Sequence, residues 1–326
     1  MIIESEFTPA WWLPGCHLQT IWPKFIRRNQ AIETQTEELE LPDGDFIELD
    51  WLQKPKDSRT PLVVVLHGLE GSVDSHYAKG MLMAIQQKGW AGVVMHFRNC
   101  GKKNNRLPRF YHSGETQDAR FLINELRRRY PENPMAAIGF SLGGNVLCKY
   151  QGEEGSRSPL SAAVVISAPL HLSASCDRIA TGNSRIYQHY LLKMLKDNLL
   201  EKARHLDMQA HIKVDLNKIP QIKQIRQFDD WVTAPLHGFR DAADYYAQSS
   251  GLKFMGEIIS PTLFIHALDD PFLSDKVIPK RNQLSTACRF EISQHGGHVG
   301  FISGTNPRRP VFWQEQRALT YIEEQL

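Results

Sequence analysis

One stretch constrains this chain more than any other: residues 139–143, which read Gly-Phe-Ser-Leu-Gly. They follow an apolar run and precede a segment with helical spacing, so we expect the chain to turn sharply there from a strand into a helix. Such a turn strains the backbone of its central residue and tolerates only small neighbours two positions away. Gly139 and Gly143 provide that room. The pattern therefore predicts that Ser141 presents its hydroxyl above a sheet as a nucleophile.

The alternation of strand-like and helix-like segments indicates a mostly parallel sheet. Apolar and polar residues alternate on both sides of the Pro-Asp-Gly turn at 42–44, which predicts a hairpin over residues 36–51. Residues 62–66, 90–97 and 135–139 are apolar runs typical of strands that are buried on both faces. Because helical spacing fills the segments between these runs, the pattern is a repeated β-α-β unit, whose natural product is a parallel sheet.

The same pattern divides the chain into a core and two additions. Strand signals are weak over residues 171–256, which are mainly helical in spacing. We therefore expect an α/β core of residues 36–170 and 257–326, with a helical cap inserted at 171–256. Residues 1–35 are expected to form an arm that packs on the core and buries its three tryptophans. A membrane-surface anchor or a wall of the substrate pocket are alternative roles for that arm.

Composition and charge argue against several other classes of protein. The 326 residues are 42% hydrophobic and carry a formal net charge of +2, which fits a globular protein and gives no basis for nucleic-acid binding. The five cysteines are odd in number and form no C-x-x-C pair, so neither a disulfide framework nor a zinc ribbon is indicated. Without a signal-peptide pattern or an apolar stretch of membrane-spanning length, we expect a cytoplasmic protein with no obligate protein partner.

A serine nucleophile needs a base, and the base needs an acid that orients it. One late apolar run is followed by Asp269 and Asp270, and the next by His295 and His298. The resulting order, Ser-Asp-His, is that of the α/β-hydrolase fold. We expect His298, which follows two glycines, to take the proton from Ser141. Asp270 is expected to orient His298, because it lies at the better distance from its strand, with Asp269 as the alternative.

Two backbone N–H groups are expected to stabilise the oxyanion of a tetrahedral intermediate. One belongs to Leu142, directly after the nucleophile, and the other to Leu69, just after the end of the predicted strand 62–66. His67 lies between that strand and Leu69, and we interpret it as structural.

Two other chemistries use some of the same residues. His295, His298 and the paired aspartates are good zinc ligands, but no cluster such as H-E-x-x-H accompanies them, and a zinc site leaves Ser141 without a role. Dehalogenases and epoxide hydrolases of this fold attack with a carboxylate, so a serine at position 141 argues against both. We expect neither a metal nor an organic cofactor.

Five stretches carry a resemblance to a known family: His-Leu-Gln-Thr at 17–20, His-Gly-Leu-Glu-Gly-Ser at 67–72, Gly-Phe-Ser-Leu-Gly-Gly-Asn at 139–145, Thr-Ala-Pro-Leu-His-Gly-Phe at 233–239 and Asp-Asp-Pro-Phe at 269–272. Over nearly its whole length the chain resembles the α/β-hydrolase-4 family, in particular its bacterial YheT-like hydrolases. The resemblance implies a carboxylesterase-type Ser-Asp-His hydrolase, and its eukaryotic members act on lipid esters or phospholipids or transfer acyl groups to ethanol. Where relatives tend to have Arg-Gly-Cys-Gly and small residues, residues 98–103 read Arg-Asn-Cys-Gly-Lys-Lys, in a loop that we expect near the mouth of the site.

These observations together predict an α/β-hydrolase fold, with a mostly parallel twisted sheet flanked by helices and an inserted helical cap. The predicted activity is hydrolysis of a small-molecule carboxylic ester with an apolar acyl group, of short to medium chain length or lipid-like, through an acyl-enzyme on Ser141. An acyltransferase or thioesterase that uses the same residues is one alternative. A catalytically silent binding protein with this fold is the other.

Overall fold

A computed structural model of the chain describes residues 1–28 and 30–326. Within this part, nine strands form one sheet in the order β1-β9-β8-β7-β6-β4-β5-β3-β2. Neighbours from β1 to β5 run parallel, and β3 and β2 complete one edge as an antiparallel hairpin. The strand bounds are β1 Ile2–Glu4, β2 Gln35–Glu40, β3 Phe46–Gln53, β4 Leu62–Leu66, β5 Ala91–Met95, β6 Met135–Phe140, β7 Ala162–Ile166, β8 Thr262–Ala267 and β9 Cys288–Ser293. The predicted mostly parallel sheet is thus confirmed.

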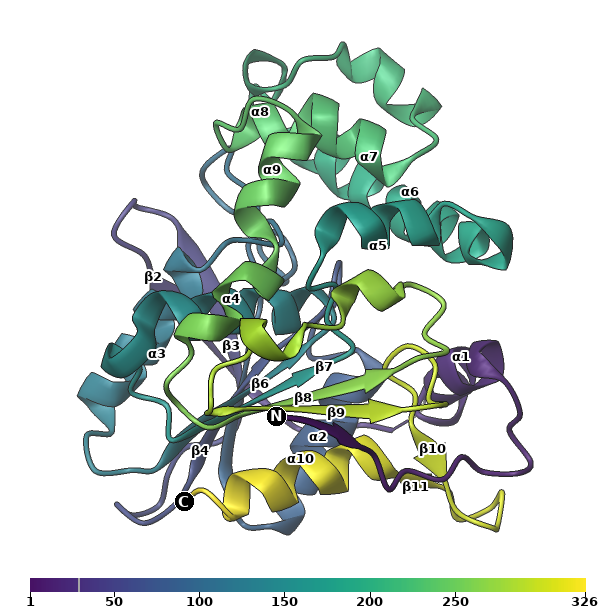
Figure 1. The fold of residues 1–326 in the computed structure, drawn as a ribbon. Coiled ribbons are helices and arrows are strands. Elements are labelled where there is room, and N and C mark those ends of the chain that lie inside the picture. Colours follow the sequence, from purple (N-terminus) through teal and green to yellow (C-terminus); the bar gives the residue numbers. More distant parts are fainter. Residues whose placement is uncertain (29) are drawn as a thin grey trace.

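Helices cover both faces of this sheet because its central strands are apolar on both sides. In β4, Leu62, Val64 and Leu66 pack into one cluster, while Val63 and Val65 pack into another. The first cluster includes side chains of α3 (Gln117–Arg129) and α4 (Leu142–Glu154), and the second includes those of α2 (His76–Gln87) and α10 (Trp313–Glu323). Figure 1 shows α3 and α4 above the sheet and α2 and α10 below it.

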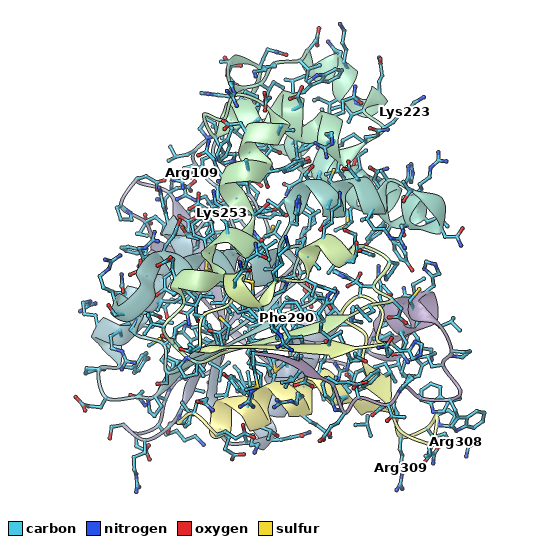
Figure 2. All side chains as sticks on the ribbon, in the orientation of Figure 1. Arg109, Lys223, Lys253, Phe290, Arg308 and Arg309 are labelled. Carbon is cyan, nitrogen blue, oxygen red and sulfur yellow. The ribbon has the colours of Figure 1, made fainter. Side chains whose placement is uncertain are left out.

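Charged side chains surround this interior. Figure 2 shows Phe290, from β9, in the middle of the molecule, where its side chain is 1% exposed, whereas Lys223, Arg308 and Arg309 project from the periphery. A small second sheet pairs β10 (Ile302–Ser303) with β11 (Val311–Phe312), next to the start of α10.

The cap, our name for residues 171–256, stands above the sheet in Figure 1. Its helices are α5 (Leu172–Ile179), α6 (Arg185–Lys202), α7 (Ile225–Phe228), α8 (Ala234–Leu236) and α9 (Ala242–Ser249), and a π-helical turn, Asp229–Thr233, joins α7 to α8. The cap has an apolar cluster of its own, with Leu192, Leu199 and Phe228 buried in it. None of the helices in the described residues is both long and apolar enough to cross a membrane.

The N-terminal arm adds the outermost parallel strand to the sheet. In β1, Ile2 pairs with Phe290 of β9, and the arm then passes the end of the sheet and forms helix α1 (Cys16–Ile26). The expectation that all three tryptophans are buried is wrong for Trp11, which is 74% exposed. Its indole N–H donates to the carbonyl oxygen of Thr305 at the surface, so its polar atom is satisfied without burial of the ring.

Candidate active site

The chain makes a sharp turn where β6 ends and α4 begins. Ser141 occupies the corner with φ 50° and ψ −116°, a backbone conformation that residues with a side chain rarely adopt. A Cβ atom at position 139 would lie 2.5 Å from the carbonyl oxygen of Gly143, and one at position 143 would lie 2.4 Å from that of His67. Because those neighbours are backbone atoms, neither position can accept a larger residue without a shift of the main chain.

The structure brings Ser141, His298 and Asp270 together at the carboxyl ends of the parallel strands. The Nε2 atom of His298 lies 3.0 Å from the Oγ atom of Ser141, and its Nδ1 atom lies 2.8 Å from Oδ2 of Asp270. Because a carboxylate can only accept, Nδ1–H donates to Asp270, which leaves Nε2 free to accept the hydroxyl proton of Ser141. Asp270 and His298 are 2% and 8% exposed, so this contact is shielded from water.

Asp269, the alternative acid, has a different set of contacts. Its Oδ1 atom accepts from the N–H of Gly297 at 2.9 Å, and its Oδ2 atom lies 3.4 Å from Nδ1 of His295. His295 is largely exposed, with 61% of its side chain open to solvent. Asp269 therefore holds the loop that carries His298, and it does not contact the His298 ring.

The loop around His298 is strained and packed closely on α1. Val299 and Phe301 have positive φ angles, 55° and 49°, which is unusual for residues of their size. The N–H of His298 donates to Oγ1 of Thr20 at 2.9 Å. A Cβ atom on Gly297 would lie 2.5 Å from the carbonyl oxygen of Cys16, so only glycine permits this approach. Sequence reasoning missed Thr20, because no local pattern reveals which distant residue supports a loop.

The two predicted oxyanion donors have no hydrogen-bond acceptor within residues 1–28 and 30–326. In the loop that follows β4, the N–H groups on either side of Leu69 are both occupied: that of Gly68 donates to the Tyr77 hydroxyl and that of Glu70 donates to the Tyr111 hydroxyl. The N–H of Leu69 lies between these two groups and donates to no atom of the described residues. That of Leu142 belongs to the first residue of α4, where helix geometry provides no intrahelical acceptor.

Two ionisable side chains of the same loop, the buried His67 and the partly buried Glu70, lie beside these donors. Burial lowers the pKa of His67 to about 3, and the neutral ring donates from Nδ1 to the carbonyl oxygen of Gly68 and accepts from the N–H of Phe97. His67 therefore fixes the shape of the loop. Burial raises the pKa of Glu70, whose carboxylate accepts from the Tyr111 hydroxyl and from the side-chain amide of Asn198 on α6.

A cavity of about 820 Å³ opens over Ser141, between the core and the cap. Its size lies in the range of small-molecule sites. Ser141, Leu142, Leu69 and His298 line its floor, and most of the cap side chains that face it are apolar, among them Leu172, Ile179, Leu191, Met194, Leu195 and Ile225. One exception is Asp229 of the π-helical turn, whose pKa burial raises to about 6, although hydrogen bonds from Tyr246 and Thr233 partly offset that effect.

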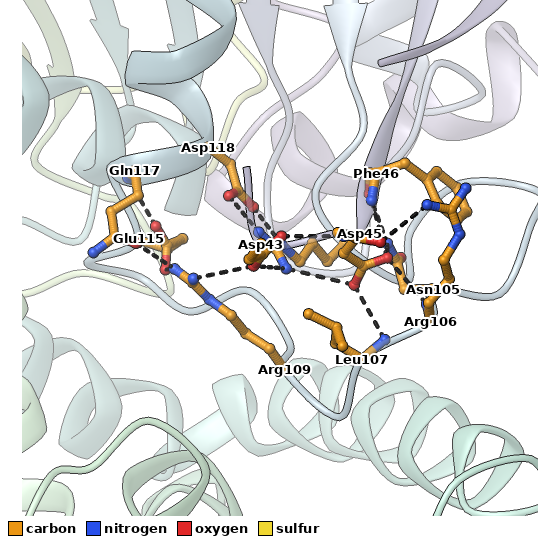
Figure 3. Close-up of polar contacts among 12 residues, drawn as sticks. Asp43, Asp45, Phe46, Asn105, Arg106, Leu107, Arg109, Glu115, Gln117 and Asp118 are labelled. Carbon is orange, nitrogen blue, oxygen red and sulfur yellow. Dashed lines mark hydrogen bonds and ion pairs between the residues drawn. The ribbon is translucent and has the colours of Figure 1, made fainter. Parts of the chain in front are cut away.

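None of residues 98–103 lines this cavity, but the carbonyl oxygen of Asn99 accepts from the side-chain amide of Asn198, which also donates to Glu70 in the cavity wall. Arg98 is instead buried behind the cavity wall, where it donates to Asp118 of α3 and to Asp43 in the β2–β3 turn. Figure 3 shows Asp43, Asp45 and Asp118 converging at this point. Three carboxylates surround the guanidinium group and hold Arg98 in this position.

No group of three or more histidine, cysteine, aspartate or glutamate side chains in the described residues is placed to hold a metal ion. The residues weighed as zinc ligands separate into two pairs, His298 with Asp270 and His295 with Asp269.

Comparisons with known proteins identify the family of the fold. The family model for the alpha/beta hydrolase fold matches residues 61–305. A protein of Escherichia coli (strain K12) named "Putative esterase YheT" is 44% identical over 325 residues, which cover 98% of this chain and 95% of that protein. A monoacylglycerol lipase of Saccharomyces cerevisiae is 32% identical over 261 residues, which cover 78% of this chain and 57% of the lipase.

Among more distant relatives, the human phospholipase ABHD3 is 27% identical over 319 residues, which cover 95% of this chain and 77% of the phospholipase. The solved structure of the Pyrococcus furiosus esterase Pf2001 matches with a TM-score of 0.56 at 14% identity and covers 100% of this chain and 98% of that one. At such low identity the structural match shows a shared fold.

Proposed function

The chain belongs to the alpha/beta hydrolase fold family, and we propose that it is a serine hydrolase that cleaves carboxylic esters through an acyl-enzyme on Ser141. One observation carries the proposal: the 3.0 Å contact from Ser141 to His298, continued by the 2.8 Å contact from His298 to Asp270, at the floor of a cavity. The names of the relatives, esterase, phospholipase and lipase, support a hydrolase.

In the first half of the reaction, Oγ of Ser141 attacks the ester carbonyl carbon while its proton passes to Nε2 of His298. Asp270 stabilises the imidazolium ion that forms. The carbonyl oxygen becomes an oxyanion and accepts hydrogen bonds from the N–H groups of Leu69 and Leu142, which have no acceptor among the residues that the structure describes. When the tetrahedral intermediate collapses, the alcohol leaves with the proton from His298, and the acyl group stays on Ser141.

In the second half, water takes the place of the alcohol. Its proton passes to His298 as its oxygen attacks the acyl-enzyme, the same two N–H groups bind the second oxyanion, and the carboxylic acid leaves as the proton returns to Ser141. The apolar cap side chains over the serine favour an acyl chain in the cavity.

Hydrolysis of p-nitrophenyl esters over a series of acyl lengths tests the proposal, with Ser141→Ala as the control protein. We expect hydrolysis by the wild-type protein and a loss of nearly all turnover in the variant, with folding retained. Equal rates in the two proteins would remove Ser141 from the mechanism.

A fluorophosphonate probe and product analysis separate the remaining activities. Labelling of Ser141 by the probe is expected from a hydrolase and from an acyltransferase, and its absence would identify a silent binding protein. Ester products that form when an alcohol is added would point to acyl transfer, and a strong preference for thioesters would point to a thioesterase.

A further inference from the structure

Exposed apolar side chains gather on two neighbouring helices at one side of the molecule. On α1, Leu18, Ile21 and Phe25 follow one another at helical spacing and form one outward stripe, with Phe25 66% exposed. On α6, Ile186 is 73% exposed and Tyr190 is 49% exposed. We call these five residues the apolar rim. Single exposed apolar residues are normal on a protein surface, whereas a group of them often marks a site of interaction.

The helices that carry the two halves of the rim contact each other at the cavity. The ammonium group of Lys24 on α1 donates to the hydroxyl of Tyr190 on α6 at 3.1 Å and lies 4.6 Å from the centre of its ring. Ile21, Phe25, Ile186 and Tyr190 are exposed and also line the cavity that contains Ser141. In Figure 1, α1 lies beside the ends of β8 and β9, below α6. The rim is therefore the outer edge of the candidate active site.

Positively charged side chains lie next to the apolar rim in the sequence, in and just after α1 and in α6. Lys24, Arg28 and Arg185 are exposed, and none of the three forms an ion pair with a carboxylate of the described residues. Helix α1 itself contains no acidic residue. Of the three acidic residues that line the cavity, only Asp74 is exposed, and it is paired with Lys79. The surface therefore combines apolar side chains with uncompensated cations.

We propose that the apolar rim docks on an anionic lipid surface and places the entrance of the cavity against it. An amphipathic helix with aromatic and aliphatic residues on one face and cations beside them lies in the boundary region of a bilayer. Anionic headgroups would meet Lys24, Arg28 and Arg185, while Phe25 and Ile186 enter the acyl layer. An ester with an apolar chain could then pass from the bilayer to Ser141 without crossing water.

Charge argues for a lipid surface over a second copy of the chain. A two-fold contact through the rim would bring the cations of both copies together, with no acidic residue on α1 to compensate for them. A bilayer with negative headgroups provides both the apolar layer and the opposite charge. The docking does not depend on the proposed hydrolase activity, because binding can be measured without turnover.

Sedimentation of the full chain with large vesicles tests the proposal. We expect the protein to sediment with vesicles of phosphatidylcholine and phosphatidylglycerol in equal parts, and to do so less at high salt or with phosphatidylcholine alone. Protein that stays in the supernatant with anionic vesicles at low salt would overturn the proposal.

Two variants and a matched control assign the binding to the rim. The double variant Phe25→Ser, Ile186→Ser should lower the partition coefficient about tenfold or more, because two large side chains no longer enter the apolar layer. Lys24→Gln with Arg185→Gln should lower it on anionic vesicles only. Ile259→Ser removes an isoleucine that is 60% exposed and does not line the cavity, so it should bind like wild type.

Two results would contradict the assignment to lipid. If the Ile259→Ser control loses as much vesicle binding as the rim variant, binding depends on exposed apolar residues in general and is not specific to the rim. The second result is a rim variant that leaves vesicle binding unchanged and instead converts an oligomer of the protein into a monomer. That result would show that the rim binds a second copy of the chain. Melting temperatures equal to that of the wild type would show that each variant is folded.

Discussion

The ring of Phe272 lies flat against the imidazole of His298, with the two centroids 3.9 Å apart and the planes 8° from parallel. Phe272 also donates its backbone N–H to Oδ1 of Asp270 at 2.8 Å. One residue therefore holds both members of the proposed acid–base pair, the acid through its main chain and the base through its ring.

We expect Phe272→Leu to lower kcat, because the imidazole loses the flat surface that keeps it facing Ser141. Contacts between aromatic rings contribute about 0.5–1.5 kcal/mol, which corresponds to a decrease of roughly two- to thirteenfold. Steady-state kinetics with a p-nitrophenyl ester measure this effect. Phe254→Leu is the matched control, since Phe254 is also half-buried but lies outside the cavity, and it should retain the wild-type kcat.

The two neighbouring aspartates should differ strongly in their effect on catalysis. Asp270→Asn removes the acceptor that fixes the tautomer of His298, and kcat should fall by about 10⁴, as in the triad of serine proteases. Asp269→Asn weakens contacts to Gly297 and His295 only, so we expect a loss of a few-fold. Comparison of kcat for the two purified variants is sufficient. A severe loss in the Asp269 variant alone would reassign the acid.

The glycine at position 139 should be essential for stability. A methyl group there would lie 2.5 Å from the carbonyl oxygen of Gly143, so we expect Gly139→Ala to lower the free energy of unfolding by about 3 kcal/mol. Gly256→Ala is the control, because its Cβ atom would meet nothing nearer than 3.7 Å. Urea denaturation of both variants gives the comparison, and equal midpoints would show that the turn can relax around a methyl group.

Asp229 should make stability depend on pH in a direction opposite to that of most carboxylates. Its folded pKa, about 6, lies above the ordinary value of 3.8, so the folded state binds the proton more tightly than the unfolded state does. The contribution of Asp229 to stability therefore falls as the pH rises from 4 to 7, by up to roughly 3 kcal/mol.

Asp229→Asn cannot titrate and should lack this loss. The difference in unfolding free energy between variant and wild type, measured in urea at several pH values, should therefore grow in favour of the variant between pH 4 and 7. Other titrating groups cancel in this difference because both proteins contain them. A difference that does not change with pH would mean that Asp229 has an ordinary pKa.

Much of the fold could be predicted from patterns of apolar residues within short segments of the sequence. The apolar run at 62–66 became β4 with the same bounds, Leu62–Leu66, because a strand buried on both faces needs an uninterrupted run of apolar residues. Strand β1 could not be predicted in this way. Its three residues, Ile2–Glu4, are too few to show a period, and their pairing depends on β9, far along the chain.

Some features of the site were also predictable from local sequence patterns, and others were not. Ser141, Asp270 and His298 each follow a strand, and parallel strands end at one edge, so their order in the sequence predicts their proximity. The roles of Thr20 and Phe272 depend on how a loop and a helix pack in three dimensions, which no spacing encodes. The burial of Arg98 could not be predicted for a related reason. Arg98 is drawn inward by carboxylates from α3 and from the β2–β3 turn, which are separate segments of the chain.

The position of β1 beside β9 has a consequence for biosynthesis. The ribosome makes β1 long before its partner, so this edge of the sheet can form only after residues 288–293 have emerged. The hydrogen bond from His298 to Thr20 is subject to the same delay, since its two residues are also far apart in the sequence. A nascent chain can therefore build its central strands early, but it gains a braced histidine loop only after residue 298 has emerged.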